Sequence, residues 1–122
     1  MDERRSVPRW AVNQDADLQI EDQPHTIPCT VEDISANGMR LSLGKRLFSE
    51  AFSNISLALG QALNLNLGAH VAWQEQSEAK FTYGLFFNNI DDVQRNKIKE
   101  YIYNNFSEQD RRGLNEQWWR GA

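Results

Sequence analysis

The sequence predicts a mainly β protein, built as an antiparallel barrel or sandwich and followed by a helical segment. From residue 16 to residue 87 the large apolar residues recur with a period of two, which is typical of strands that bury one face. After Phe87 the apolar spacing changes to about 3.6 residues, the period of an amphipathic helix. Because short strands leave unpaired edges unless the sheet closes or packs on another, we expect a barrel or a sandwich.

The length and composition fit one soluble domain over residues 1–122. The chain is 40% hydrophobic, 11% aromatic and 25% charged, which is too apolar for wholesale disorder. No stretch approaches the roughly 18 to 20 apolar residues that span a bilayer, and no hydrophobic segment follows the charged first residues. We therefore expect a cytoplasmic protein without membrane insertion.

Six short strands account for the alternating region, residues 16–88. They are expected at residues 16–21, 26–35, 39–43, 52–59, 63–73 and 81–87. In each strand the inward residues share one parity, and the longest such run extends from Leu63 to Trp73. The short turns between strands favour antiparallel pairing of neighbours.

A C-terminal helical segment is expected over residues 89–120. Asn89, Asp91 or Asp92 is suited to cap its first helix. The stripe facing the barrel comprises Val93, Lys97 through its aliphatic stem, Ile98, Tyr101, Ile102 and Phe106. Ser107 and Asp110 favour the start of a further helix. Its apolar residues are Leu114, Trp118 and Trp119.

The single cysteine predicts neither a disulfide nor a metal site. Cys29 lies between Ile27 and Val31 and is interpreted as a small buried hydrophobe. The two histidines, His25 and His70, form no cluster with it at metal-ligand spacing. We therefore expect no structural zinc and no cofactor.

Positive charge is concentrated at the N-terminus of a protein whose formal net charge is −4. Arg4, Arg5 and Arg9 fall within the first nine residues, and the next lysine or arginine is Arg40. With little apolar content, residues 1–12 are expected to form a mobile arm whose guanidinium groups suit an anion clamp. The net negative charge argues against a general nucleic-acid binder, which needs a basic surface.

Residues 30–39 combine a hairpin signal with a break in strand parity. Asn37-Gly38 favours a tight turn, because both residues tolerate positive φ. The inward residues are odd-numbered as far as Val31, yet the next large apolar residue is Ile34. This break predicts a bulge or strand end near Glu32.

Such a bulge turns Asp33 and Ser35 outward together at the rim of the sheet. A carboxylate accepts hydrogen bonds from the N1 and N2 donors of guanine, and an arginine fork suits either guanine O6 and N7 or a phosphate. The rim pair and the cationic arm are therefore complementary to the same ligand, a guanine nucleotide.

These residues resemble the two signatures of PilZ domains. Arg5-Ser6-Val7-Pro8-Arg9 matches RxxxR, with Arg4 as an additional arginine, and Asp33-Ile34-Ser35-Ala36-Asn37-Gly38 matches [D/N]xSxxG. A strand that ends in Val71-Ala72-Trp73, a strand that contains Tyr83-Gly84-Leu85-Phe86 and a final helix also agree with that domain. The resemblance covers residues 2–106.

The resemblance implies a six-stranded antiparallel barrel of the split-barrel type that binds the bacterial second messenger cyclic di-GMP without catalysis. The residues that it implies for the ligand are Arg4, Arg5 and Arg9 as a clamp, Asp33 and Ser35 on a guanine edge, Gly38 in the close turn, and Trp73. In similar single-domain members a tryptophan at the position of Trp73 flanks the bound guanine. The parity of Trp73 fits the barrel core equally well, so both roles stay open.

On this resemblance we expect a receptor that orders its arm over the barrel rim when cyclic di-GMP binds, and so changes the surface offered to an unidentified protein partner. The alternative is an adaptor of the same fold that acts without ligand, through Gln117-Trp118-Trp119-Arg120. An enzyme is disfavoured, because His70 is isolated and no phosphate loop occurs. A single-stranded nucleic-acid barrel is also disfavoured, because residues 63–73 and 81–87 include no lysine or arginine.

Overall fold

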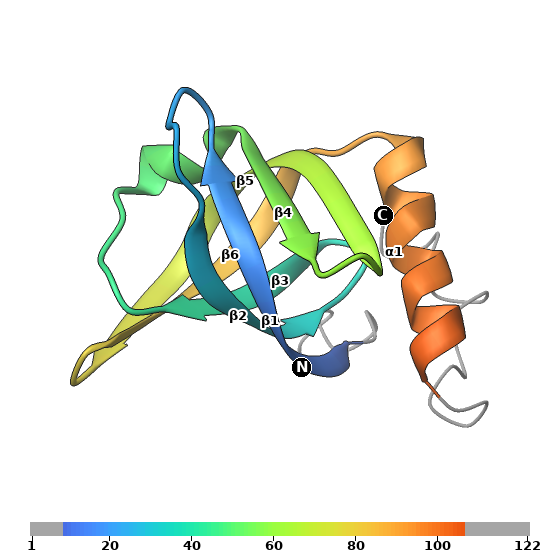
Figure 1. Cartoon of the computed structure of the whole chain (residues 1–122), viewed down its shortest axis with the longest axis horizontal. Coiled ribbons are helices and arrows are strands. Elements are labelled where there is room, and N and C mark those ends of the chain that lie inside the picture. The colour runs from blue at the N-terminus through green and yellow to red at the C-terminus, as the bar shows by residue number, and fades with distance from the viewer. Residues whose placement is uncertain (1–8, 107–122) are drawn as a thin grey trace, which may run out of the picture.

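The structure, a computed structural model, describes residues 9–106. Figure 1 shows its strands and its single long helix. In chain order the elements are β1 (Trp10–Ile20), β2 (Ile27–Ile34), β3 (Gly38–Leu43), the short 3-10 helix η2 (Ser49–Ser53), β4 (Ile55–Leu59), β5 (Leu63–Ser77), β6 (Lys80–Asn89) and α1 (Asp92–Asn105).

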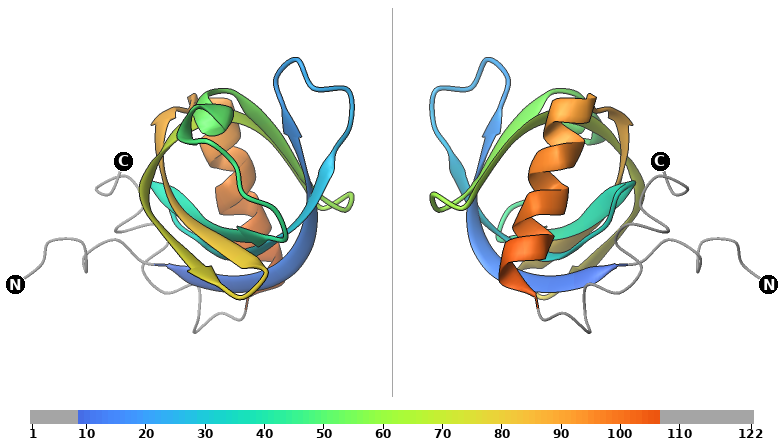
Figure 2. Two further views of the ribbon diagram at one scale, coloured as in Figure 1. Left: turned by 90° about the vertical axis from the view of Figure 1, so that its left-hand side faces the viewer. Right: turned by 90° about the vertical axis from the view of Figure 1, so that its right-hand side faces the viewer.

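The six strands close into a barrel in the order β1-β2-β3-β6-β5-β4, and every neighbouring pair is antiparallel. Figure 2 shows the closed ring of strands, with α1 lying across one opening of the barrel. The expected antiparallel barrel is confirmed, and the sandwich is excluded. Closure gives every strand two paired neighbours, although the residues of β1 before Asp17 and those of β5 after Leu67 pair on one edge only.

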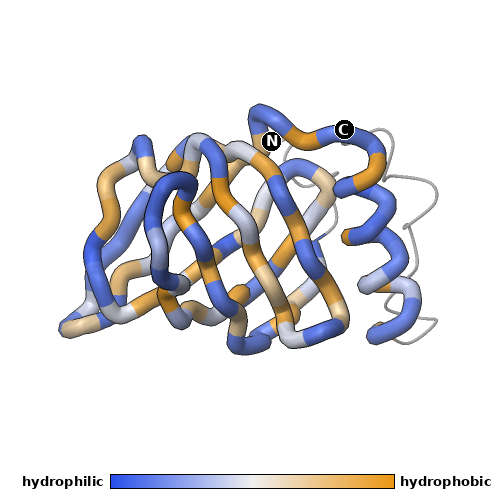
Figure 3. The backbone as a smooth tube through the Cα atoms, turned by 45° about the horizontal axis from the view of Figure 1, so that its top comes forward, coloured by the Kyte–Doolittle hydropathy of each residue, from blue (hydrophilic) through white to orange (hydrophobic). Residues whose placement is uncertain are grey.

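The barrel encloses a single apolar core. Along the strands hydrophobic and hydrophilic residues alternate, as the expected period of two requires (Figure 3). The side chains with no exposed area are Leu18, Val31, Leu41, Phe52, Ile98 and Ile102. Because the last two belong to α1, this helix completes the core at the opening that it covers.

Two strands begin at positions other than those expected. β1 begins at Trp10 instead of residue 16, and Trp10 and Val12 are buried, so residues 10–12 belong to the barrel and not to the arm. The expected strand of residues 52–59 begins only at Ile55, because Phe52 lies in η2 and enters the core from that 3-10 turn. Phe52 has the opposite parity to Ile55, Leu57 and Leu59, which agrees with its place outside the strand.

The helix begins at one of the expected caps, but its inner face is rotated. Asp91 is the N-cap, and its carboxylate accepts a hydrogen bond from the backbone N–H of Gln94 at 2.9 Å. Val93, expected on the buried stripe, is 60% exposed, and Gln94 is buried in its place. Gln94 Oε1 accepts from the backbone N–H of Asn66 at 2.8 Å, which ties α1 to β5.

Two further expectations concern the rest of the chain. The second helix near residues 107–120, with Trp118 and Trp119, lies outside the described residues. Within residues 9–106 no helix is long and apolar enough to cross a membrane.

The expectation for the thiol is confirmed. Cys29 is buried, and burial, followed by the charges of Asp17 and Asp15, raises its pKa to about 12.

Candidate functional site

A bulge in β2 organises the outer face of the barrel near the β2–β3 turn. Val31 pairs with Leu41 and Asp33 with Arg40, so Glu32 is an extra residue opposite β3. The break predicted near Glu32 is therefore confirmed. The bulge leaves Glu32 and Asp33 side by side with Arg40, and their side chains are only 16% and 13% exposed.

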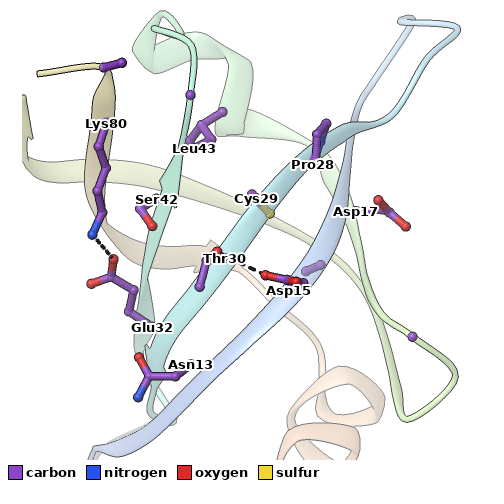
Figure 4. A pocket seen from close by; sticks show the side chains of 14 residues that line it. Asn13, Asp15, Asp17, Pro28, Cys29, Thr30, Glu32, Ser42, Leu43 and Lys80 are labelled. Carbon is purple, nitrogen blue, oxygen red and sulfur yellow. Dashed lines mark hydrogen bonds and ion pairs between the residues drawn. The ribbon is translucent and has the colours of Figure 1, made fainter.

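These carboxylates belong to a network of alternating charges. Asp33 Oδ1 lies 3.0 Å from Arg9 Nη1, and Asp33 Oδ2 lies 3.2 Å from Arg40 Nη2. Arg40 Nε lies 3.2 Å from Glu32 Oε1, and Glu32 Oε2 lies 3.1 Å from Lys80 Nζ. Figure 4 shows Lys80 reaching Glu32 across β3. Each largely buried carboxylate thus has two cationic neighbours, which compensate its lost hydration.

The same network determines the protonation of Glu32. Burial by itself raises the pKa of Glu32, but hydrogen bonds from Ser42 and Lys80 and the charges of Lys80 and Arg40 outweigh burial. The pKa of Glu32 therefore lies below its ordinary value, and the group is ionised at neutral pH.

The turn between β2 and β3 is held by the hydroxyl of Ser35. Ser35 Oγ accepts from the backbone N–H groups of Asn37 and Gly38, both at 3.2 Å, and lies 3.3 Å from the Gly38 carbonyl oxygen. The prediction that Ser35 faces outward is wrong, since its side chain is 2% exposed. Its hydroxyl is turned into the loop because two backbone donors there need an acceptor.

Gly38 is required for close approach and not for positive φ. Neither Asn37 nor Gly38 is among the residues with positive φ in the described part of the chain, so the expectation that this turn uses positive φ is wrong. A Cβ at Gly38 would overlap the backbone carbonyl oxygen of Leu85 on β6. The absence of a side chain is what allows β3 and β6 to meet here.

Trp73 lies on the outside of the barrel. Val71 pairs with Leu85 and Trp73 with Gly84, so Ala72 is an extra residue in β5. This bulge reverses the faces of the strand, and Trp73 is 44% exposed. Its indole lies across Gly84, where a Cβ would overlap Trp73 Nε1 and Cε2. The core alternative for Trp73 is therefore excluded.

These elements enclose a cavity of about 500 Å³ at the turn. Its lining residues are Arg9, Ser35, Asn37, Gly38, Met39, Ala72, Trp73, Gly84, Leu85 and Phe86. The structure thus brings together Arg9, Ser35, Gly38 and Trp73 of the predicted site, with Asp33 in contact with Arg9. Arg4 and Arg5 lie outside the described residues.

Three site residues were missed by sequence reasoning. Phe86 is 46% exposed, and its ring centroid lies 5.2 Å from that of His70. Two adjacent phenylalanines in one strand signal that one of them faces outward, and a glycine within a strand, such as Gly84, signals close approach. Arg40 has no sequence signal, because its role depends on its position opposite the bulge.

A larger hollow, of about 810 Å³, lies over the outer face of β1, β2 and β3 (Figure 4). Asp15, Asp17 and Glu32 line it, and its cation, Lys80, is paired with Glu32. Carboxylates in that arrangement repel phosphate. The smaller cavity, with an arginine and an exposed indole, is the candidate site for an anionic aromatic ligand.

Comparison with known proteins agrees with this geometry. The family model of the PilZ domain matches residues 3–104. The chain belongs to the PilZ domain family. A search of proteins with curated functions found no match.

Solved PilZ structures share the fold at low sequence identity. The PilZ domain of YcgR from Escherichia coli, with c-di-GMP, is 14% identical with a TM-score of 0.64, over 93% of this chain and 99% of that one. Full YcgR in complex with c-di-GMP is 18% identical with a TM-score of 0.65, over 83% of this chain and 45% of that one. The inhibitor of motility MotI (DgrA) of Bacillus subtilis is 20% identical with a TM-score of 0.62, over 95% and 54%. This PilZ chain thus spans about half the length of YcgR and MotI.

Proposed function

We propose that this PilZ domain is a cyclic di-GMP receptor that binds its ligand in the cavity beside the β2–β3 turn. The carrying observation is that both signatures meet there, with Arg9 bound to Asp33 at 3.0 Å and Arg9, Ser35 and Gly38 lining one cavity. The c-di-GMP complexes of YcgR support this proposal through the shared fold.

The cavity, together with Asp33 in contact with its lining residue Arg9, offers one group for each part of the ligand. Arg9 has a side chain that is 59% exposed and is available to a bridging phosphate. Asp33 accepts from the N1 and N2 donors of guanine. The exposed indole of Trp73 offers a face for stacking a base. Arg4 and Arg5 complete the clamp in this proposal, and no catalytic step is needed.

The proposed signal is a change in the surface near the N-terminus. In the described residues Arg9 is held by Asp33, so the ligand's donor edge and phosphates compete for both partners of one ion pair. Binding then draws the arginines across the cavity and alters the surface that a protein partner meets. Amide hydrogen exchange with and without cyclic di-GMP tests this step through added protection at the N-terminus and at residues 33–38.

Calorimetry with cyclic di-GMP, GMP and cyclic di-AMP tests the function itself. Arg9→Ala is expected to weaken cyclic di-GMP binding roughly ten- to hundredfold, as for loss of a charge-assisted hydrogen bond. Asp33→Ala is expected to weaken it as well, and Asp33→Asn less so, because the amide oxygen still accepts. The matched control is Arg46→Ala, an exposed arginine in the loop that follows β3.

The comparison of ligands decides the proposal. Binding of cyclic di-GMP in preference to the other two nucleotides supports it. Absence of cyclic di-GMP binding by the folded wild-type protein overturns it and favours the adaptor that acts without ligand.

A further inference from the structure

Arg40 stands in neither signature, yet it is the strand residue opposite Asp33. The register pairs Asp33 with Arg40 across β2 and β3, and Arg40 Nη2 lies 3.2 Å from Asp33 Oδ2. Arg40 does not line the cavity beside the turn. Its guanidinium binds the oxygen of Asp33 that is not bound by Arg9, which does line the cavity.

The two oxygens of Asp33 have partners of different kinds. Oδ1 is bound by Arg9, which precedes β1 and has a side chain that is 59% exposed. Oδ2 forms an ion pair with Arg40, which lies within β3 and forms a second ion pair with Glu32, although Arg40 Nε makes no hydrogen bond in the described part of the chain. Arg9 is a replaceable partner, whereas Arg40 is fixed by a paired strand and by a second carboxylate.

Glu32, which forms an ion pair with Arg40, is itself held by further contacts. Glu32 has its own partners in Lys80, at 3.1 Å, and in Ser42, which donates a hydrogen bond to it. Glu32 is thus held in place while it orients the guanidinium of Arg40. Three consecutive ion pairs run from Lys80 on β6 to Asp33 beside the cavity.

We propose that Arg40 is a positioning residue for ligand recognition, which rests on the proposed function. By holding Oδ2 it leaves Oδ1, with its two lone pairs, as the oxygen that Arg9 occupies without ligand and that the N1 and N2 donors of guanine occupy afterwards. The Asp33 side chain is only 13% exposed, so departure of Arg9 without Arg40 would leave a poorly hydrated carboxylate with no cation from residues 9–106 beside it. Arg40 keeps that carboxylate compensated and oriented during the exchange.

A double-mutant cycle on binding tests this role. Calorimetric affinities for cyclic di-GMP are measured for wild type, Arg40→Ala, Asp33→Ala and the double variant, with Arg46→Ala as the matched loss of charge. We expect Arg40→Ala to weaken binding roughly tenfold in the wild-type background and by less than about twofold in the Asp33→Ala background. Arg40→Lys is expected to restore part of the affinity, since an ammonium can reach one of the two carboxylates at a time.

The outcomes separate the two proposals. An equal loss in both backgrounds means that Arg40 contacts the ligand or acts through the fold, and overturns the positioning role alone. No loss in either background also overturns it. No binding by wild type overturns the proposed function and the positioning role together. Thermal melts of each variant accompany the titrations, and a melting temperature lowered as much by Arg46→Ala as by Arg40→Ala attributes the change to net charge.

Discussion

A loop lies at each end of β3, and in each loop one buried side-chain hydroxyl forms hydrogen bonds with backbone groups. Before β3, Ser35 Oγ accepts from two backbone N–H groups of the turn. After β3, the hydroxyl of Tyr83 accepts from the backbone N–H of Leu47 at 2.8 Å and donates to its carbonyl oxygen at 3.2 Å. Both side chains are almost fully buried. The local device is the same, a hydroxyl that satisfies loop backbone groups.

The surroundings of the two hydroxyls differ. Ser35 borders a cavity with an exposed arginine and an indole, whereas Tyr83 packs its ring against Phe52, with centroids 5.1 Å apart. Near Tyr83 the hollow measures only about 130 Å³. A buried hydroxyl in a loop is therefore a structural feature in itself, and the additional charge, aromatic face and cavity are what distinguish a candidate ligand site.

An added methyl group should affect the two ends of β3 very differently. Gly38→Ala places a Cβ against the Leu85 carbonyl oxygen and is expected to cost at least about 1 to 3 kcal/mol in free energy of unfolding. Gly44→Ala is the control, because a Cβ there meets nothing within 4 Å. Denaturant unfolding measures both variants, and equal stabilities would show that β3 and β6 approach less closely than described.

Removing each hydroxyl should separate binding from stability. Ser35→Ala leaves two backbone N–H groups without an acceptor, and Tyr83→Phe leaves the N–H and the carbonyl oxygen of Leu47 without their partner, so each is expected to lower stability by about 1 to 3 kcal/mol. Only Ser35→Ala should also weaken cyclic di-GMP binding, since Tyr83 does not line the cavity. Calorimetry at a temperature where both variants are folded checks this, and a matched loss of affinity in Tyr83→Phe would contradict the distinction.

A substitution at Gly84, which lies under the indole of Trp73, should affect only the end of β3 that borders the cavity. Gly84→Ala should displace Trp73 from its place across the strand and weaken cyclic di-GMP binding by about tenfold, the lower part of the range for one stacked base. Stability should change little, because the half-exposed indole can move into solvent. In a Trp73→Ala background the same substitution should have no further effect on affinity, and a persisting loss would assign the effect to the strand itself.

The smallest expected effect concerns Glu32, which lies between the two ends. Because its pKa is lowered in the folded state, its stabilisation is present above its unfolded pKa and is lost as the pH falls through its folded pKa. Glu32→Gln should therefore lower the melting temperature at neutral pH, with a difference from wild type that shrinks as the solution is acidified. Melts across acidic pH test this, with the exposed Glu50→Gln as the control.

Most of the barrel could be predicted from the sequence, because alternation survives wherever a strand stays in register. Prediction from alternation failed where the backbone is irregular. In β1, a register shift between Ala11 and Gln14 interrupts the alternation, so the strand start at Trp10 was missed. In α1, the hydrogen bond of Gln94 to β5 favours a buried amide over the exposed Val93.

The site was predictable only where short motifs contain it. Arg9, Ser35 and Gly38 lie in such motifs and do meet at one cavity. The orientation of Ser35 and the contacts of Arg40 were not predictable, since they arise from backbone donors and from a cross-strand partner. Such relations are properties of register, which a pattern along one strand does not contain.

The bulge at Ala72 determines which face of the barrel Trp73 occupies. The apolar residues from Leu63 to Trp73 share one parity, yet the indole faces outward. The reason is that Val71 and Trp73 are two positions apart in β5, whereas their partners Leu85 and Gly84 are adjacent in β6. If Ala72 paired regularly with Gly84, Trp73 would lie opposite Tyr83 and its indole would turn inward, whereas deletion of Ala72 would leave Trp73 opposite Gly84 on the outer face. The exposed indole is thus a property of how β5 pairs with β6, and a shift of register can bury or expose it while the hydrophobic composition stays the same.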